Sequence, residues 1–317
     1  MHAPGNGPFF AVYYSTIASF GVPGRCGLSK CITRYLVFMA VADFLVIVTA
    51  VILSRLRVIY FNSSLLSTTP ACSLIILLSW VSKDASVWFT VAFTFDRFVA
   101  ICCQKVKQRY CTEKTAAVVI GTVCLLGIVK NVPLYFKYEP LYIMDNVPWY
   151  CIIREIYYTS VAWRFCDWLH RILNPCFPFV LISLLNAFTI KHIIAASAAR
   201  KRLRSQNQGD KQSDPEMESR RRSIILLMAI SGTFLLLKLT YIVNFLFVQI
   251  SSKIYATNTN SYDPKFILQE SGHMLDLLSS CTNSCIYAGT QTKFRQQLKI
   301  AVKYPVNVMS KCIRGRS

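Results

Sequence analysis

The sequence predicts an all-α membrane protein whose helices cross the bilayer several times. Hydrophobic residues make up 54% of the 317-residue chain and charged residues only 16%, whereas soluble domains carry about 25% charged residues. Several apolar windows exceed the roughly 20 residues that a helix needs to cross a 30 Å hydrocarbon core. The windows cover residues 9–23, 35–54, 71–103, 115–136, 172–194, 223–250 and 266–289. The loops between them are short, so these spans are expected to form the fold.

Positive charge predicts how the chain is oriented in the membrane. If the N-terminus is extracellular and the C-terminus cytoplasmic, four cytoplasmic segments hold 23 of the 35 Lys and Arg residues. These segments are residues 23–34, 104–114, 191–222 and 290–317. Cytoplasmic loops of membrane proteins carry such an excess of Lys and Arg. The net charge of +20 is therefore a topology signal that suits a lipid bilayer, and we expect no nucleic-acid partner.

The first span is expected to be truncated. The apolar stretch FFAVYYSTIASFGV has 14 residues, which make a helix of about 21 Å, short of the 30 Å core. It runs through Pro23, Gly24 and Arg25 almost directly into the second span.

The next three spans are bounded by simple signals. The second contains one charge, Asp43, and the third is long and ends after Asp96 and Arg97. Thr112-Glu113 is typical of a helix start and predicts where the fourth span begins. Pro133 is expected to end or kink that span.

The last three spans carry kinks and isolated charges. Asn174-Pro175 and Pro178 predict kinks at the outer end of the fifth span, which follows a long extracellular loop at 137–168. The sixth begins at the basic run 220–222 and the seventh ends near Gly289. A short amphipathic helix is expected next, with Phe294, Leu298 and Val302 on one side. We therefore expect a membrane domain over residues 1–303 and a basic cytoplasmic tail over 304–317.

Two cysteines are the best disulfide candidates. Cys72 opens the third span and Cys151 lies in the loop 137–168, both on the oxidising extracellular side. Asn62-Ser63-Ser64 is a glycosylation sequon on the same side.

Several motifs occur in a fixed order along the chain. Asp43 lies in the second span, and Cys72 lies 25 residues before the Arg of Asp96-Arg97-Phe98. The segment 283–287, NSCIY, looks like the NPxxY motif with Ser in place of Pro. Over residues 34–303 the chain resembles the rhodopsin-like (class A) G-protein-coupled receptors. The TFDRFVAICCQ segment and the lack of a Trp in span four are similar to vertebrate orphan receptors linked to L-tryptophan and L-phenylalanine.

The resemblance implies a receptor of the plasma membrane with two kinds of partner. A small extracellular ligand, an aromatic amino acid or a related zwitterion, would bind outside. A heterotrimeric G protein would bind inside, with phospholipase C as the first expected pathway. Asp96 would hold the inactive state and release Arg97, which stays charged and offers five donors. Asn283 and Tyr287 would share the inner seam.

Buried polar residues suggest two further sites. If the resemblance holds, Asp43, Ser86 and Asn283 converge at mid-membrane, either around a Na⁺ ion or as a hydrogen-bonded core. Ionisable residues also occupy the upper and middle thirds of spans three, six and seven: Lys83, Asp84, Lys238 and Asp276. Lys83 and Asp84 point roughly 100° apart on a helix, so pairs across helices are expected.

We expect Lys238–Asp276 to be the leading pair, with Asp84 as the next partner for Lys238. The ionisable residues either bind a ligand or form a structural network. Trp80 and Arg55 are further ligand-binding candidates at the outer mouth.

Other functions fit the sequence less well. Lys238 and Thr240 stand where the family carries Trp and Pro, so a degenerate receptor that does not signal is the main alternative. A transporter would show repeated halves. A retinal pigment needs a Lys in span seven. Only four histidines are present, without an H-E-x-x-H motif, so we do not expect an enzyme or a bound cofactor other than Na⁺.

Overall fold

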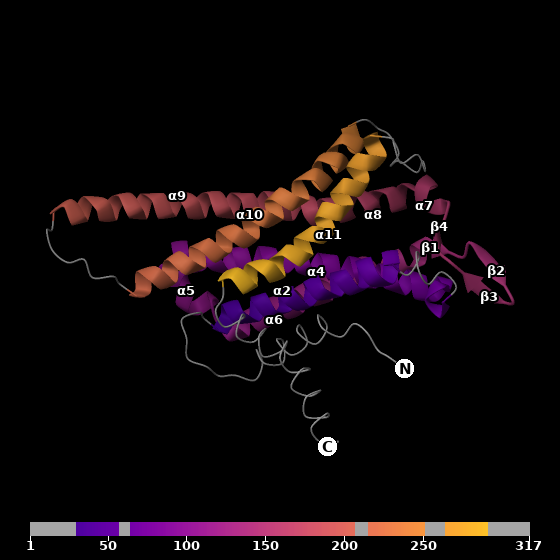
Figure 1. The fold of residues 1–317 in the computed structure, drawn as a ribbon, viewed down its shortest axis with the longest axis horizontal. Helices are drawn as coiled ribbons and strands as arrows, with labels where there is room; N and C mark the ends of the chain where they lie inside the picture. Colours follow the sequence, from indigo (N-terminus) through magenta and orange to yellow (C-terminus); the bar gives the residue numbers. More distant parts are fainter. Residues whose placement is uncertain (1–29, 57–63, 207–214, 251–263, 291–317) are drawn as a thin grey trace, which may run out of the picture.

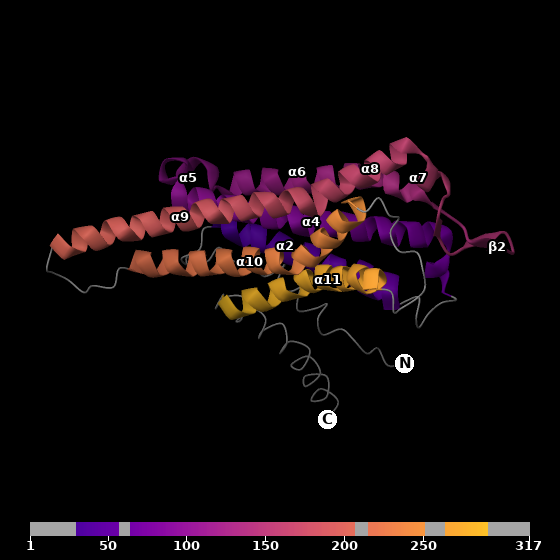
Figure 2. The same ribbon diagram turned by 90° about the horizontal axis from the view of Figure 1, so that it is seen from above.

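A computed structural model of the chain describes residues 30–56, 64–206, 215–250 and 264–290. Long helices run along an elongated bundle, and a β-hairpin projects from one end (Figures 1 and 2). The long helices are α2 (Lys30–Val46) with its π-helical continuation η1 (Ile47–Leu56), α4 (Thr69–Cys102), α6 (Glu113–Asn131), α9 (Phe177–Gln206), α10 (Pro215–Ile250) and α11 (Pro264–Thr290). The expected first span, the helix after Gly289 and the basic tail lie outside the described residues.

Five helical segments of the described residues are long and apolar enough to cross a membrane. They are Cys31–Ser54, Thr69–Cys102, Glu113–Lys137, Val161–Ala199 and Ser223–Phe247. The helix α11 has 27 residues, enough in length, but it contains Glu270, Asp276 and a run of Ser, Thr and Asn. The all-α, multi-span fold predicted from the sequence is confirmed.

Helix starts follow the local sequence. Thr112 caps α6, and its Oγ1 accepts a hydrogen bond from the N–H of Thr115, 3.2 Å away. Such a cap satisfies one of the four free N–H groups at a helix start. Pro215 and Pro264 open α10 and α11, where a missing N–H costs nothing. The predicted start of the fourth span at Thr112-Glu113 is therefore confirmed. That helix ends at Asn131, two residues before Pro133, and a 3₁₀ turn follows, η3 (Val132–Lys137).

The fifth span begins earlier than the apolar window predicted. Helix α8 (Val161–Arg171) precedes the π-helical segment η4 (Ile172–Cys176), which leads into α9. Asn174 has non-helical angles, φ −157° and ψ 111°, next to Pro175. The predicted kink is thus present, but the start of the span at residue 172 was wrong. Polar residues on one side of α8 lower the average hydropathy that had defined the window.

The extracellular loop expected at 137–168 also contains regular structure. Strand β1 (Tyr138–Glu139) pairs with β4 (Ile152–Ile153), and β2 (Tyr142–Met144) pairs with β3 (Val147–Trp149), both antiparallel. Asp145 and Asn146 form the turn with φ of 52° and 60°, as two-residue hairpin turns require. A single helical turn, α7 (Ile156–Thr159), leads into α8. A short 3₁₀ segment, η2 (Leu65–Ser67), precedes α4, and α5 (Gln104–Tyr110) lies in the connection between α4 and α6.

The main core lies where α2, α4, α6 and α10 meet. Its largest buried side chains include Tyr35, Met39, Phe89, Phe93 and Leu227. By contrast, α6 exposes a wide apolar face that includes Val118, Leu125 and Val129. An apolar outer face around a packed interior is what a helix bundle in lipid requires, because lipid tails solvate it. Helices α10 and α11 run side by side in both views (Figures 1 and 2).

Candidate functional site: polar clusters from the outer to the inner face

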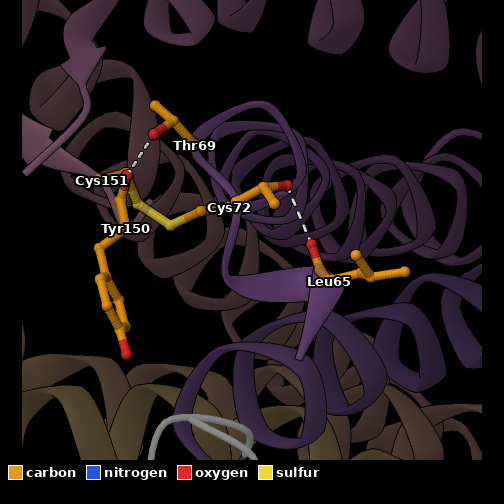
Figure 3. Close-up of a disulfide and its surroundings, with 6 residues drawn as sticks. Leu65, Thr69, Cys72, Tyr150 and Cys151 are labelled. Atoms are coloured by element: carbon orange, nitrogen blue, oxygen red, sulfur yellow. Dashed lines mark hydrogen bonds between the residues drawn. A yellow bond between two sulfur atoms is a disulfide. The ribbon is translucent and has the colours of Figure 1, made fainter. Parts of the chain in front are cut away.

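A disulfide fastens the hairpin to the Thr69 end of α4, which is the outer end in the orientation expected from the sequence. Cys72 and Cys151 are bonded, with their Cα atoms 6.2 Å apart, within the range usual for disulfides. Beside the bond, Thr69 Oγ1 donates to the carbonyl oxygen of Tyr150 at 2.5 Å (Figure 3). The N–H of Tyr150 donates to the Ser67 carbonyl at 2.7 Å. The pair expected from the sequence is thus present, and these bonds attach the hairpin segment to the start of α4.

The buried carboxylate of Asp276 pairs with two ammonium groups in the outer half of the bundle. Lys238 on α10 donates to Oδ1 of Asp276 on α11. Lys83 on α4 lies 3.3 Å from the other oxygen, Oδ2. The expected Lys238–Asp276 pair is therefore present, but Lys83 shares the same carboxylate. We refer to Lys83, Lys238 and Asp276 as the outer charge cluster.

Asp84 points away from the outer charge cluster, towards the end of α6 and η4. It accepts hydrogen bonds from the amides of Asn131 and Asn174, and Lys130 Nζ lies 2.6 Å from its Oδ2. Neighbouring residues on a helix cannot face the same partner, as expected for Lys83 and Asp84. Asp84 is therefore not a partner of Lys238. Sequence reasoning missed Lys130 and Asn131, although a Lys-Asn pair at the outer end of an apolar span was a visible signal.

Aromatic and polar groups lie next to the outer charge cluster. Lys83 Nζ lies 5.5 Å from the centre of the Trp80 ring, and the ring of His170 meets Trp80 edge-on at 4.9 Å. Arg171 follows His170 on α8. It pairs with Asp167, one turn earlier on the same helix, at 2.8 Å, and donates a hydrogen bond to the Tyr241 hydroxyl on α10 at 3.3 Å.

The outer edge of this region contains Tyr157, whose hydroxyl donates to Asp167 at 2.6 Å. Burial and this hydrogen bond raise the pKa of Tyr157 above its usual range. Trp168 does not lie beside the outer charge cluster. It is 45% exposed and stacks on Phe165 at the periphery of the bundle.

Asp43 forms the middle polar cluster. Its carboxylate, 1% exposed, accepts hydrogen bonds from the Ser86 hydroxyl on α4 and from Asn283 Nδ2 on α11 at 2.9 Å. The convergence of Asp43, Ser86 and Asn283 expected from the sequence is therefore present. These carboxylate, hydroxyl and amide oxygens are ligands that hard cations accept.

Asp96 and Arg97 form the inner cluster. Arg97 Nε donates to Asp96 Oδ2 at 3.1 Å, and Nη1 donates to Ser223 Oγ on α10 at 3.3 Å. Cys31 Sγ on α2 donates to Asp96 Oδ1 at 3.1 Å. Asp96 and Arg97 are 0% and 4% exposed. The side chain of Arg97 therefore joins α4 to α10 at the inner end.

A second contact joins the inner ends of α2 and α6. Arg34 Nη2 lies 2.8 Å from Glu113 Oε2, and its Nη1 donates to the Glu113 carbonyl at 3.0 Å. Close by, Cys111 Sγ contacts the Asp96 carbonyl at 3.8 Å. Burial raises the pKa of the Cys111 thiol to about 11, so it is protonated at neutral pH.

Three of the candidate residues lie where no side chain is described. Asn62 lies outside the described residues, and the side chains of Arg55 and Tyr287 are not described either. Their proposed roles in glycosylation, ligand binding and activation stay predictions.

Comparisons with known proteins agree with this arrangement. The model of the 7 transmembrane receptor (rhodopsin family) matches residues 26–287. The FMRFamide receptor of Drosophila melanogaster is 22% identical over 296 residues, covering 88% of this chain and 49% of that receptor. The probable G-protein coupled receptor 142 of Mus musculus is 23% identical over 300 residues, covering 91% of this chain and 71% of that protein. This chain thus spans about half the length of the first relative and more of the second.

Proposed function

Because the chain belongs to the rhodopsin family of seven-transmembrane receptors, we propose that it carries a small-ligand signal from outside the cell to a heterotrimeric G protein inside. Members of this family are receptors of the plasma membrane and not enzymes. The apolar helical spans suit this location. The expected orientation, with the N-terminus outside and the C-terminus inside, completes the proposal.

Arg97 is the residue that contacts the G protein in this proposal. The supporting observation is its position: it is buried, held by Asp96 and hydrogen-bonded to Ser223 on α10. If α10 moves outward, the hydrogen bond between Ser223 and Arg97 breaks, and the guanidinium of Arg97 turns towards the cytoplasm. A permanently charged group with five donors is suited to bind a carbonyl-rich or acidic partner surface.

The proposed ligand is an aromatic amino acid or a related zwitterion. Trp80 supplies an aromatic face, and the outer charge cluster beside it supplies charge of both signs. A ligand with a ring and a charged head matches this pairing. A peptide is the competing ligand class, since one relative is a receptor for FMRFamide.

Asp43 is the proposed site of a Na⁺ ion. The carboxylate and the Ser86 hydroxyl supply oxygens at one buried point. Asn283, whose Nδ2 donates to Asp43, would turn its amide oxygen towards the ion. Replacing NaCl by N-methylglucamine chloride should lower the Tm of the purified protein, and Asp43→Asn should remove the difference. Equal Tm values for the unmodified protein in both salts would contradict a sodium site.

Signalling can be tested without knowing the ligand. The full-length chain, expressed in cells, should raise inositol phosphate above the level in cells carrying Arg97→Ala at equal surface density. This readout reports phospholipase C, and cyclic AMP should be measured in parallel to cover other G proteins. If neither messenger differs between the two proteins, the non-signalling receptor is favoured. The specific observation behind that alternative is Lys238, tied to Asp276 where the family carries a Trp.

A further inference from the structure

The outer charge cluster contains two lysines and one carboxylate. Asp84 has Lys130 as its partner, and Asp167 on α8 has Arg171. Asp276, by contrast, has two partners, Lys83 and Lys238. Among the residues that the structure describes, no second carboxylate lies within 4.0 Å of either lysine. The outer charge cluster therefore carries an unmatched charge of +1.

This unmatched charge lies away from water. The side chains of Lys83, Lys238 and Asp276 are 19%, 7% and 10% exposed. An ionised ammonium group in such surroundings is costly unless it is paired. Aromatic rings give partial compensation, since Trp80 lies 5.5 Å from Lys83 Nζ and Phe234 lies 5.7 Å from Lys238 Nζ. Such contacts compensate a charge less than a full counter-ion would.

The two lysines are not equivalent. Lys238 is the more buried and donates a hydrogen bond to Asp276, whereas Lys83 is more exposed and lies farther away, at 3.3 Å. Lys83 is therefore the ammonium group that can turn to another anion while Lys238 keeps Asp276 neutralised.

We propose that the outer charge cluster is an anion-binding site, in which Lys83 takes the carboxylate of an extracellular ligand or a free inorganic anion as its counter-ion. The inference rests on the proposed receptor function, because that function requires access from outside. It makes the ligand an acid or a zwitterion and excludes a simple amine, which Lys83 and Lys238 would repel. The adjacent Trp80 ring gives an organic acid with an aromatic group an additional contact.

The test measures binding by stability, independently of signalling. The purified full-length chain in lipid nanodiscs receives sodium chloride or sodium 3-phenylpropionate, each replacing the bulky sulfonate HEPES at constant sodium and ionic strength. Phenethylamine, which has the ring without the acid, is the matched probe. We expect an anion to raise the Tm by a few degrees, as a ligand that binds only the folded state does. Phenethylamine should give no rise.

Three variants locate the effect. Lys83→Met should abolish the anion-dependent rise and still fold, because Lys238 and Asp276 remain a neutral pair. Lys83→Arg should keep the rise, and Lys107→Met, at an exposed inner lysine, should behave as the unmodified protein. A larger shift with 3-phenylpropionate identifies an organic acid as the ligand, and a shift with chloride alone identifies an inorganic anion.

Three results would overturn the proposal: no anion-dependent shift in the unmodified protein, the same shift in Lys83→Met, or a shift with phenethylamine as large as that with 3-phenylpropionate. Signalling separates this inference from the receptor function. If signalling depends on Arg97 but no anion shifts the Tm, the anion site is wrong and the receptor function stands. If anions shift the Tm but no signal is found, the anion site stands and the receptor function is wrong.

Discussion

Arg97 on α4 donates a hydrogen bond to Ser223 on α10, with Nη1 and Oγ 3.3 Å apart, while its Nε binds the neighbouring Asp96 at 3.1 Å. This contact joins the two helices at the inner end of the bundle. It involves a charged donor, so it contributes more than a neutral hydrogen bond would. We interpret the arrangement as a closed state in which α10 covers Arg97.

Removal of the Ser223 hydroxyl should favour opening. Ser223→Ala takes away one acceptor of Arg97, and the loss of roughly 1 kcal/mol should raise basal nucleotide exchange about fivefold. The measurement is nucleotide exchange by a G protein mixed with purified receptor. Thr233→Ala, which removes a hydroxyl elsewhere on α10, is the control and should leave the rate unchanged. An unchanged or lower rate for Ser223→Ala would show that the contact does not hold the closed state.

Asp276 should be the most sensitive member of the outer charge cluster. Asp276→Asn leaves Lys83 and Lys238 without their shared carboxylate, and breaking a buried pair typically costs about 3–5 kcal/mol. Lys238→Met should cost much less, because Lys83 and Asp276 remain a neutral pair. Thermal unfolding in detergent measures both effects.

The double variant provides the control for this prediction. Lys238→Met should recover part of the loss caused by Asp276→Asn, since it removes one of the two unmatched charges. Strictly additive losses would show that these residues do not interact.

Loss of the Cys72–Cys151 disulfide should impair delivery of the protein to the cell surface. The bond closes a segment of 79 residues, and removal of a native disulfide typically costs about 2–5 kcal/mol. We expect Cys72→Ser and Cys151→Ser to lower surface density to a similar extent. Cys166→Ser changes an exposed free cysteine and serves as the control. Free thiols at both positions, found by peptide mapping of the surface-expressed protein, would rule out the bond.

The orientation in the membrane can be tested with epitope tags. A tag within residues 207–214 or in the tail 304–317 should be stained only after permeabilisation, whereas a tag at the N-terminus should be stained on intact cells. The physical reason is the excess of Lys and Arg in the segments 191–222 and 290–317. Staining of either inner tag on intact cells would reverse the topology and remove Arg97 from the cytoplasmic side.

Much of the helix framework could be predicted because hydropathy and helix signals are local. The third span was expected at 71–103 and occupies Thr69–Cys102, and Thr112-Glu113 marked the start of α6. The sequence also identified the residues around Asp43 and the Lys238–Asp276 pair. These expectations depended on the family resemblance or on the rule that buried charges must pair.

Other features depend on how helices are rotated against one another, which hydropathy does not report. Lys130 could have extended to the membrane surface, as lysines near helix ends often do, but it turns inward to Asp84. The sharing of Asp276 by two lysines was missed for the same reason. The hairpin had a local signal, Asp145-Asn146, which the long extracellular loop obscured. The amphipathic α8 was missed because its polar face lowers the hydropathy of the window.

In the proposed function, Arg97 transmits the signal to a G protein. The direct measurement is the rate of nucleotide exchange by a purified G protein in the presence of the full-length chain in lipid nanodiscs, with and without Arg97→Ala. We predict that the unmodified chain accelerates exchange and that Arg97→Ala abolishes the acceleration while surface expression stays largely intact. Equal acceleration by both proteins would contradict the role of Arg97, and no acceleration by the unmodified chain with any G-protein class would contradict signalling itself.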